Sequence, residues 1–75
     1  MSESRADLSF RIDELESSLP YLKMKHPSAS RLRSAVGSWA DSLLGKADFN
    51  DQVWAFLKVN AMLERHAMAP LDYAD

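Results

Sequence analysis

Residues 8–22, LSFRIDELESSLPYL, place a leucine or isoleucine at every turn of a helix. These apolar residues are spaced alternately by four and three positions, and they are Leu8, Ile12, Leu15, Leu19 and Leu22. The spacing gives a helix one apolar stripe and predicts a packed helix that begins near Arg5. Pro20 lies inside the stretch and cannot donate a backbone hydrogen bond to Glu16. The helix is therefore either broken or kinked at Pro20, and we favour the kink because the stripe keeps its phase as far as Leu22.

Two further helical segments follow, with short breaks between them. The second segment repeats the four-three-four spacing, at Leu32, Val36, Trp39 and Leu43. Pro27 and Ser28 are typical of a helix start, and Gly45 is typical of the position after a helix end. The fold class that we predict is therefore all-α, a small antiparallel helical bundle of three helices.

The third segment is expected to begin at a cap residue, either Asp48 or Asn50, and to run to about Met68. Asn50 is the better cap, because Phe49 and Trp54 would then form a hydrophobic staple across it. The sequence therefore predicts a helix start at Asn50.

The composition is that of a single globular domain. The chain has 75 residues, no cysteine, 47% hydrophobic and 27% charged residues, and a formal net charge of −2. The absence of cysteine excludes disulfides and thiolate metal sites. We expect one helical domain over residues 1–75, in which residues 1–4 and 70–75 are loose ends. Since neither a signal peptide nor an apolar run of about 20 residues is present, the expected location is the cytoplasm.

A core of this size is close to the limit of independent stability. Apolar burial contributes about 115 kcal/mol, whereas ordering the chain costs about 110 kcal/mol. The third segment has a narrow polar sector, formed by Asp51, Lys58 and Arg65, and is apolar around most of its circumference. Two neighbouring helices can cover only part of such a helix. We therefore expect another protein to dock on it, and a homodimer is the first candidate.

The sequence leaves open which flank of the third helix faces the core. One flank consists of Trp54, Leu57, Ala61 and Met68, and the other of Phe56, Val59, Met62 and Leu63. The candidate partner-binding residues are Trp54, Leu57, Ala61, Met62, Met68, Asn60 and Glu64. Asn60 and Glu64 lie one turn apart in the apolar sector. They either set the register of a partner helix, or the helix sits so that Glu64 reaches solvent at the rim.

Two other surface features have alternative interpretations. The basic cluster of Lys23, Lys25, Arg31 and Arg33 could contact phosphates, so the alternative function is a small nucleic-acid-binding regulator. A row of small residues in the second segment either faces solvent or allows another helix to approach closely, and it consists of Ser30, Ser34, Ser38 and Ser42, with Gly37 beside it.

No motif predicts an enzyme. The sequence has no glycine-rich phosphate loop, no nucleophile elbow and no metal-ligand spacing around His26 or His66. We therefore expect no catalysis, no cofactor and no small-molecule substrate. Membrane insertion is not expected, since the third helix lacks a basic stripe. The predicted function is a soluble protein–protein interaction module, acting as a regulator, adaptor or inhibitor.

Overall fold

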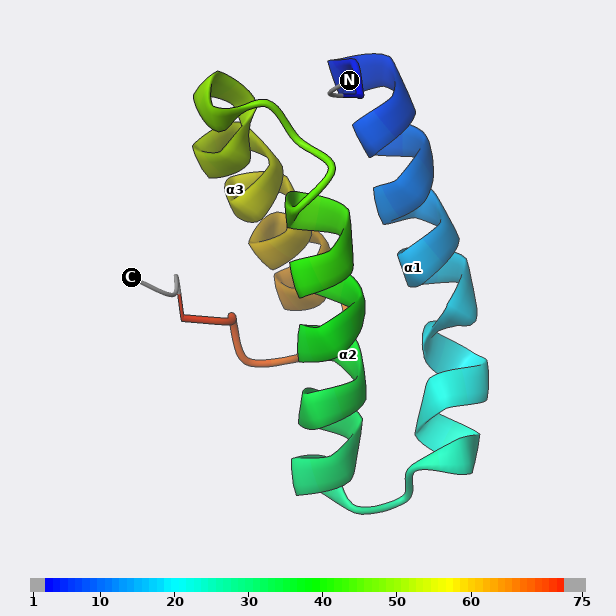
Figure 1. Ribbon diagram of the computed structural model, residues 1–75. Helices are drawn as coiled ribbons and strands as arrows, with labels where there is room; N and C mark the ends of the chain where they lie inside the picture. The colour runs from blue at the N-terminus through cyan, green and yellow to red at the C-terminus, as the bar shows by residue number, and fades with distance from the viewer. Residues whose placement is uncertain (1–2, 73–75) are drawn as a thin grey trace.

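Three helices form the protein. The computed structural model describes residues 3–72, and in it α1 spans Arg5–Lys25, α2 spans Ala29–Leu44 and α3 spans Phe49–Arg65. Figure 1 shows α1 and α2 side by side and antiparallel. The third helix, α3, runs back along α2 and is therefore parallel to α1. Each helix packs against both of the others. The predicted fold class, a small all-α bundle of three helices in which consecutive helices are antiparallel, is confirmed.

The leucine stripe of α1 is the centre of the core. All five of its members are buried, and α1 runs through Pro20 without a break. A helix end at Pro20 is therefore excluded, and the continuous phase of the stripe explains why: both halves bury the same face. On α2, the residues that meet the stripe are Val36, Ala40 and Leu43.

The start of α3 differs from the expectation. The helix begins at Phe49, with Asp48 as its N-cap, so the prediction of Asn50 as the cap is wrong. Phe49 is 84% exposed and forms no staple with Trp54. Buried Ala47 fixes the chain just before the helix, because its N–H donates to the carbonyl of Leu44 at 3.1 Å. The preceding loop is thus held in the core, and Phe49 is left outside it.

The end of α3 also comes earlier than expected, at Arg65 instead of Met68. Ala67 has a φ of 57°, in the left-handed region. The N–H of Ala67 donates to the carbonyl of Glu64 at 3.0 Å, and that of Met68 donates to the carbonyl of Leu63 at 2.9 Å. This paired arrangement is a Schellman motif, in which the left-handed residue is usually glycine. The helix therefore ends at a backbone motif that the sequence does not indicate, because the left-handed position holds Ala67 in place of glycine.

Residues at both ends of the described chain form hydrogen bonds with the rest of the fold. The N–H of Glu3 donates to the carbonyl of Lys46 at 2.9 Å, and Ser4 caps α1 by accepting the N–H of Asp7 at 3.2 Å. At the other end, the backbone of Leu71 is hydrogen bonded to the side chain of Asn60. Glu3, Ser4, Pro70 and Leu71 thus form hydrogen bonds with the rest of the fold, and the looseness of the two ends stays a prediction. Residues 1–2 and 73–75 lie outside the described part of the chain.

Replacing Ala67 with glycine should stabilise the protein. A side chain in the left-handed region is strained, whereas glycine adopts that region freely, so Ala67→Gly is expected to raise the free energy of unfolding by about 0.5–1 kcal/mol. Urea denaturation at low micromolar concentration measures the change. Ala61→Gly, the same substitution inside α3, is the control and should destabilise by about 1 kcal/mol. Equal losses in both variants would contradict the cap.

Candidate interaction surface

The structure decides which flank of α3 faces the core. Val59, Met62 and Leu63 are fully buried, together with Ala55, which the sequence analysis did not single out. Met62 was a candidate partner-binding residue, but its side chain lies inside the protomer and is not part of the surface. Phe56, on the same flank, is half-buried next to α2. The second flank is therefore the core side.

The opposite side of α3 carries an apolar row that lies in solvent. Phe49, Val53 and Leu57 are 84%, 57% and 60% exposed, and Ala61 is also exposed. These four residues are spaced by four positions and therefore follow one line along the helix. We call Phe49, Val53, Leu57 and Ala61 the outer face of α3. Large apolar side chains gathered in one row are typical of an interaction site, whereas scattered ones are not.

Trp54 lies at the edge of the outer face. It is half-buried, and two cations lie over its ring, with the guanidinium carbon of Arg5 4.8 Å and the ammonium of Lys58 5.9 Å from the ring centre. Arg5 also forms an ion pair with Asp51 at 2.9 Å. The tryptophan thus joins α1 to α3 within the protomer. Met68, the remaining apolar candidate, is half-buried against the core beyond the end of α3.

Asn60 and Glu64 have separate environments. The Asn60 Nδ2 donates to the carbonyl of Leu71 at 3.1 Å, and the N–H of Leu71 donates to Asn60 Oδ1 at 2.9 Å. Both halves of the amide are therefore used within the chain. Glu64 is exposed at the rim of the outer face. This agrees with the interpretation that the helix sits so that Glu64 reaches solvent. The polar pair does not act as a unit in the protomer.

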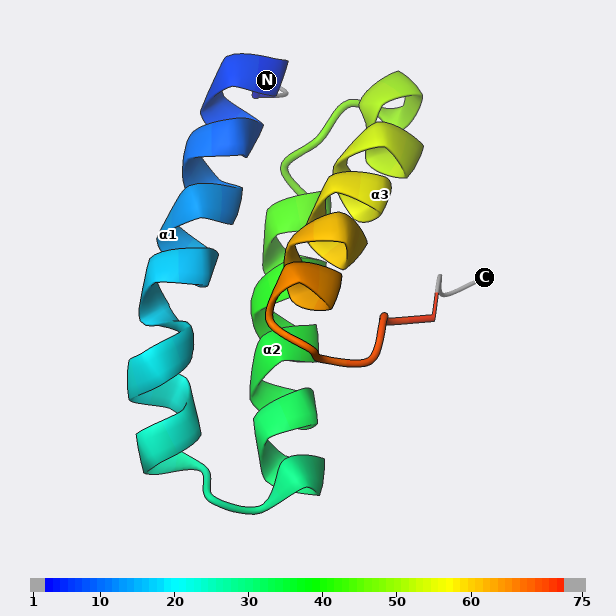
Figure 2. The ribbon, with the colours of Figure 1, turned by 180° about the vertical axis from the view of Figure 1, so that it is seen from behind.

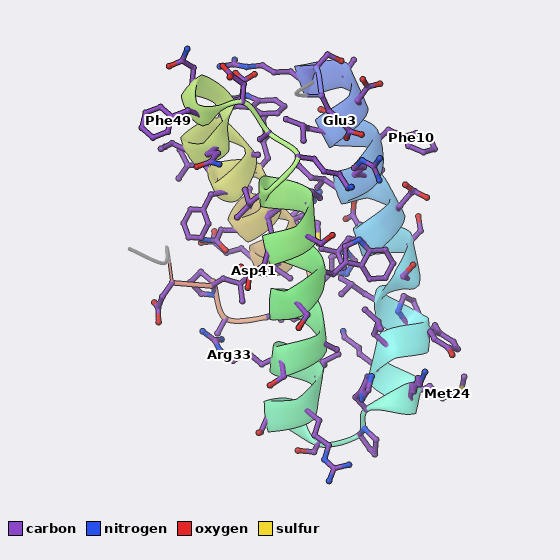
Figure 3. All side chains as sticks on the ribbon, in the orientation of Figure 1. Glu3, Phe10, Met24, Arg33, Asp41 and Phe49 are labelled. Carbon is purple, nitrogen blue, oxygen red and sulfur yellow. The ribbon has the colours of Figure 1, made fainter. Side chains whose placement is uncertain are left out.

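The basic cluster lies at the end of the bundle where α1 meets α2. Lys23, Lys25, Arg31 and Arg33 are all exposed. They do not share one direction: Figure 3 shows Arg33 on the side of α2 away from α1, where its Nη2 donates to the carbonyl of Pro70 at 3.0 Å. Lys25 lies 5.8 Å from the ring centre of Tyr21. Nucleic-acid binding by this cluster stays a prediction.

A charged cluster joins α1 to the end of α3. His66 Nε2 lies 2.8 Å from a carboxylate oxygen of Glu16, and Arg65 Nη2 lies 3.2 Å from the same oxygen. An ionised carboxylate can only accept, so both nitrogens donate. The hydrogen bond from His66 lowers the pKa of Glu16 from its ordinary value of 4.5, partial burial opposes this shift, and Arg65 adds to it. In the same way, the hydrogen bond from Arg11 lowers the pKa of Glu3.

Glu16 should make the stability depend on pH in the acid range. Because its pKa is lower in the folded chain, its contribution is present above the ordinary carboxyl pKa and is lost as the pH falls through the folded pKa. We expect Glu16→Gln to lower the free energy of unfolding at pH 7 and to flatten its decline towards pH 2. Urea denaturation across this range measures both. Asp13→Asn, at an exposed carboxylate of α1, is the control, and an unchanged slope in Glu16→Gln would contradict the assignment.

Asn60→Leu should release the segment after α3. If Asn60 lay in a helix interface, this substitution would raise the stability or change the oligomeric state, whereas the two hydrogen bonds to Leu71 predict the opposite effect on stability. Their loss should destabilise by about 1–3 kcal/mol. Amide hydrogen exchange at Leu71 should become faster, while Asn50→Leu, at an exposed amide near the start of α3, should leave it unchanged. Unaltered exchange at Leu71 in Asn60→Leu would show that the amide does not hold the segment.

The part of the chain that the structure describes contains neither a metal-ligand cluster nor a membrane-spanning helix. Within residues 3–72, no three side chains among His, Asp and Glu lie together as metal ligands would. Over the same range, no helix is long and apolar enough to cross a membrane. No family model, no curated protein and no solved structure matches the chain. A function for the protein therefore rests on the residues of its own surface.

Proposed function

We propose that the protein is a small cytoplasmic interaction module, a regulator, adaptor or inhibitor, which associates with a second copy of itself through the outer face of α3. The observation that carries this proposal is the exposure of Phe49, Val53 and Leu57 in one row. The role of the module towards other proteins would build on this dimer.

The energetics of the outer face favour a weak dimer. Removing a whole Val, Leu or Phe side chain from water contributes about 1.5–3 kcal/mol, and more than half of each of these three is exposed. Two copies bring six such side chains together, which corresponds to about 5–10 kcal/mol. Association itself costs about 4–15 kcal/mol. The most favourable ends of these two ranges leave about 6 kcal/mol, so a dimer is expected only at concentrations of tens of micromolar or above.

The residue pattern favours an antiparallel pairing of the two α3 helices. A two-fold axis at Leu57 puts this residue against its own copy, and it puts Val53 of one chain opposite Ala61 of the other. The same axis puts Asn50 opposite Glu64, so an amide donor meets a carboxylate. A parallel pairing would instead place Glu64 against Glu64, which is repulsive. The outer face is thus self-complementary in size and in charge only in the antiparallel arrangement.

Leu57→Glu should abolish self-association. The substitution places two carboxylates together at the two-fold axis, whereas the exposed position leaves the protomer core intact. Light scattering should give a mass that rises from 8.5 kDa towards twice this value with concentration for the natural chain, and a constant 8.5 kDa for Leu57→Glu.

Phe10→Glu is the matched control. Phe10 is 65% exposed, and Figure 3 shows it on the opposite side of the bundle from Phe49. This variant should dimerise like the natural chain. A natural chain that stays at 8.5 kDa up to millimolar concentration would overturn self-association, and equal effects of both variants would overturn the choice of surface.

A further inference from the structure

A groove separates α2 from α3 on the side of the bundle away from α1. Its volume is about 680 Å³, and its lining includes Ser30, Ser34, Gly37, Asp41, Gln52 and Phe56. Three members of the row of small residues on α2, Ser30, Ser34 and Gly37, form part of one wall. Figures 1 and 2 show the chain leaving the end of α3, passing α2 and reaching this side, where Leu71 and Asp72 line one end of the groove.

The segment that lines this part of the groove is held by its backbone. The side-chain amide of Asn60 bonds both the N–H and the carbonyl of one residue, Leu71, at 2.9 and 3.1 Å. Arg33 donates to the carbonyl of Pro70 at 3.0 Å. Inside a helix, the N–H and the carbonyl of a residue are already hydrogen bonded to the helix itself. The side-chain amide of Asn60 can therefore bond both groups of one residue only where the segment is not helical. All three hydrogen bonds go to backbone atoms and involve no side chain of the segment, so an extended peptide of another sequence could form them as well.

The side chain of Leu71 supplies the anchor. It is half-buried and lies between this groove and a smaller apolar pocket of about 280 Å³, whose lining includes Leu32, Val36 and Met68. A leucine side chain that packs against the core between the two cavities adds apolar burial to the backbone hydrogen bonds. The contacts combine sequence-independent backbone recognition with one specific apolar position.

We infer that the groove between α2 and α3 binds an extended, leucine-containing peptide segment of a partner protein, and that residues 70–72 of the chain occupy the same site and compete with it. The anchor leucine of the peptide replaces Leu71, and Asn60 bonds its backbone. A tethered segment acts at an effective concentration in the millimolar range, so the chain inhibits its own groove until a stronger peptide displaces the segment. This site is separate from the outer face of α3 and does not depend on self-association.

The test uses the full chain and a peptide with the sequence of residues 68–72, MAPLD, blocked at both ends. In a two-dimensional NMR titration, Leu71→Ala should bind the peptide saturably, with shifts at the amides of Ser34, Gly37 and Phe56. Its affinity should exceed that of the natural chain about tenfold or more, because the competing anchor is gone. A peptide with aspartate in place of its leucine should not bind.

Two variants make the result specific. Phe10→Ala, the same kind of truncation on α1, should bind the peptide as weakly as the natural chain. Leu71→Ala combined with Asn60→Asp should lose binding, because the carboxylate cannot donate to the peptide carbonyl. Should Leu71→Ala fail to fold, the natural chain is titrated to higher peptide concentration and should shift the same three amides. The absence of saturable shifts in the folded variant, or shifts confined to the outer face of α3, would overturn the inference.

Discussion

The leucine stripe of α1 lies against both of the other helices, so its burial determines how all three are arranged. Each of its members is buried, and the side chains that cover it come from α2 and α3 together. Within residues 3–72, the buried side chains are all apolar, so polar interactions are confined to the surface. There they fix the alignment of the helices. Arg5 pairs with Asp51 near the start of α3, and Glu16 pairs with Arg65 near its end.

Once α3 turns one side to this core, its other apolar residues have nothing in the protomer to cover them. A helix that is apolar around most of its circumference meets two neighbours over less than half of it. This constraint produces the outer face at Val53 and Leu57. The groove beside α2 has a different origin, because residues after α3 line it and are held through Asn60 and Arg33. We therefore propose different occupants for the two surfaces, a second apolar helix for one and an extended backbone for the other.

Much of the fold could be predicted from the sequence, because the stripes of α1 and α2 have a regular spacing that only a packed helix explains. The stripe even showed that α1 continues past Pro20. The ends of α3 could not be predicted, since they depend on buried Ala47 and on a left-handed Ala67. The partner of Asn60 was also beyond reach: an amide in an apolar sector indicates a hydrogen bond, but not that the acceptor is a backbone eleven residues further along the chain. The sequence grouped Trp54 with Leu57 and Met62 with Val59, but which of the two flanks faces the core, and hence that Met62 is buried, depends on the rotation of α3 about its axis.

The parallel alignment of α1 and α3 also affects how the chain is made. Arg5 and Asp51 are separated by 46 residues, and Glu16 and His66 by 50. At a synthesis rate of about 5–20 residues per second, α1 waits on the order of 2–10 s for its last neighbour. During this interval α2 alone can shield its leucines. A nascent α1–α2 hairpin therefore leaves part of the leucine stripe uncovered until α3 is made, and exposed apolar surface of this kind favours aggregation.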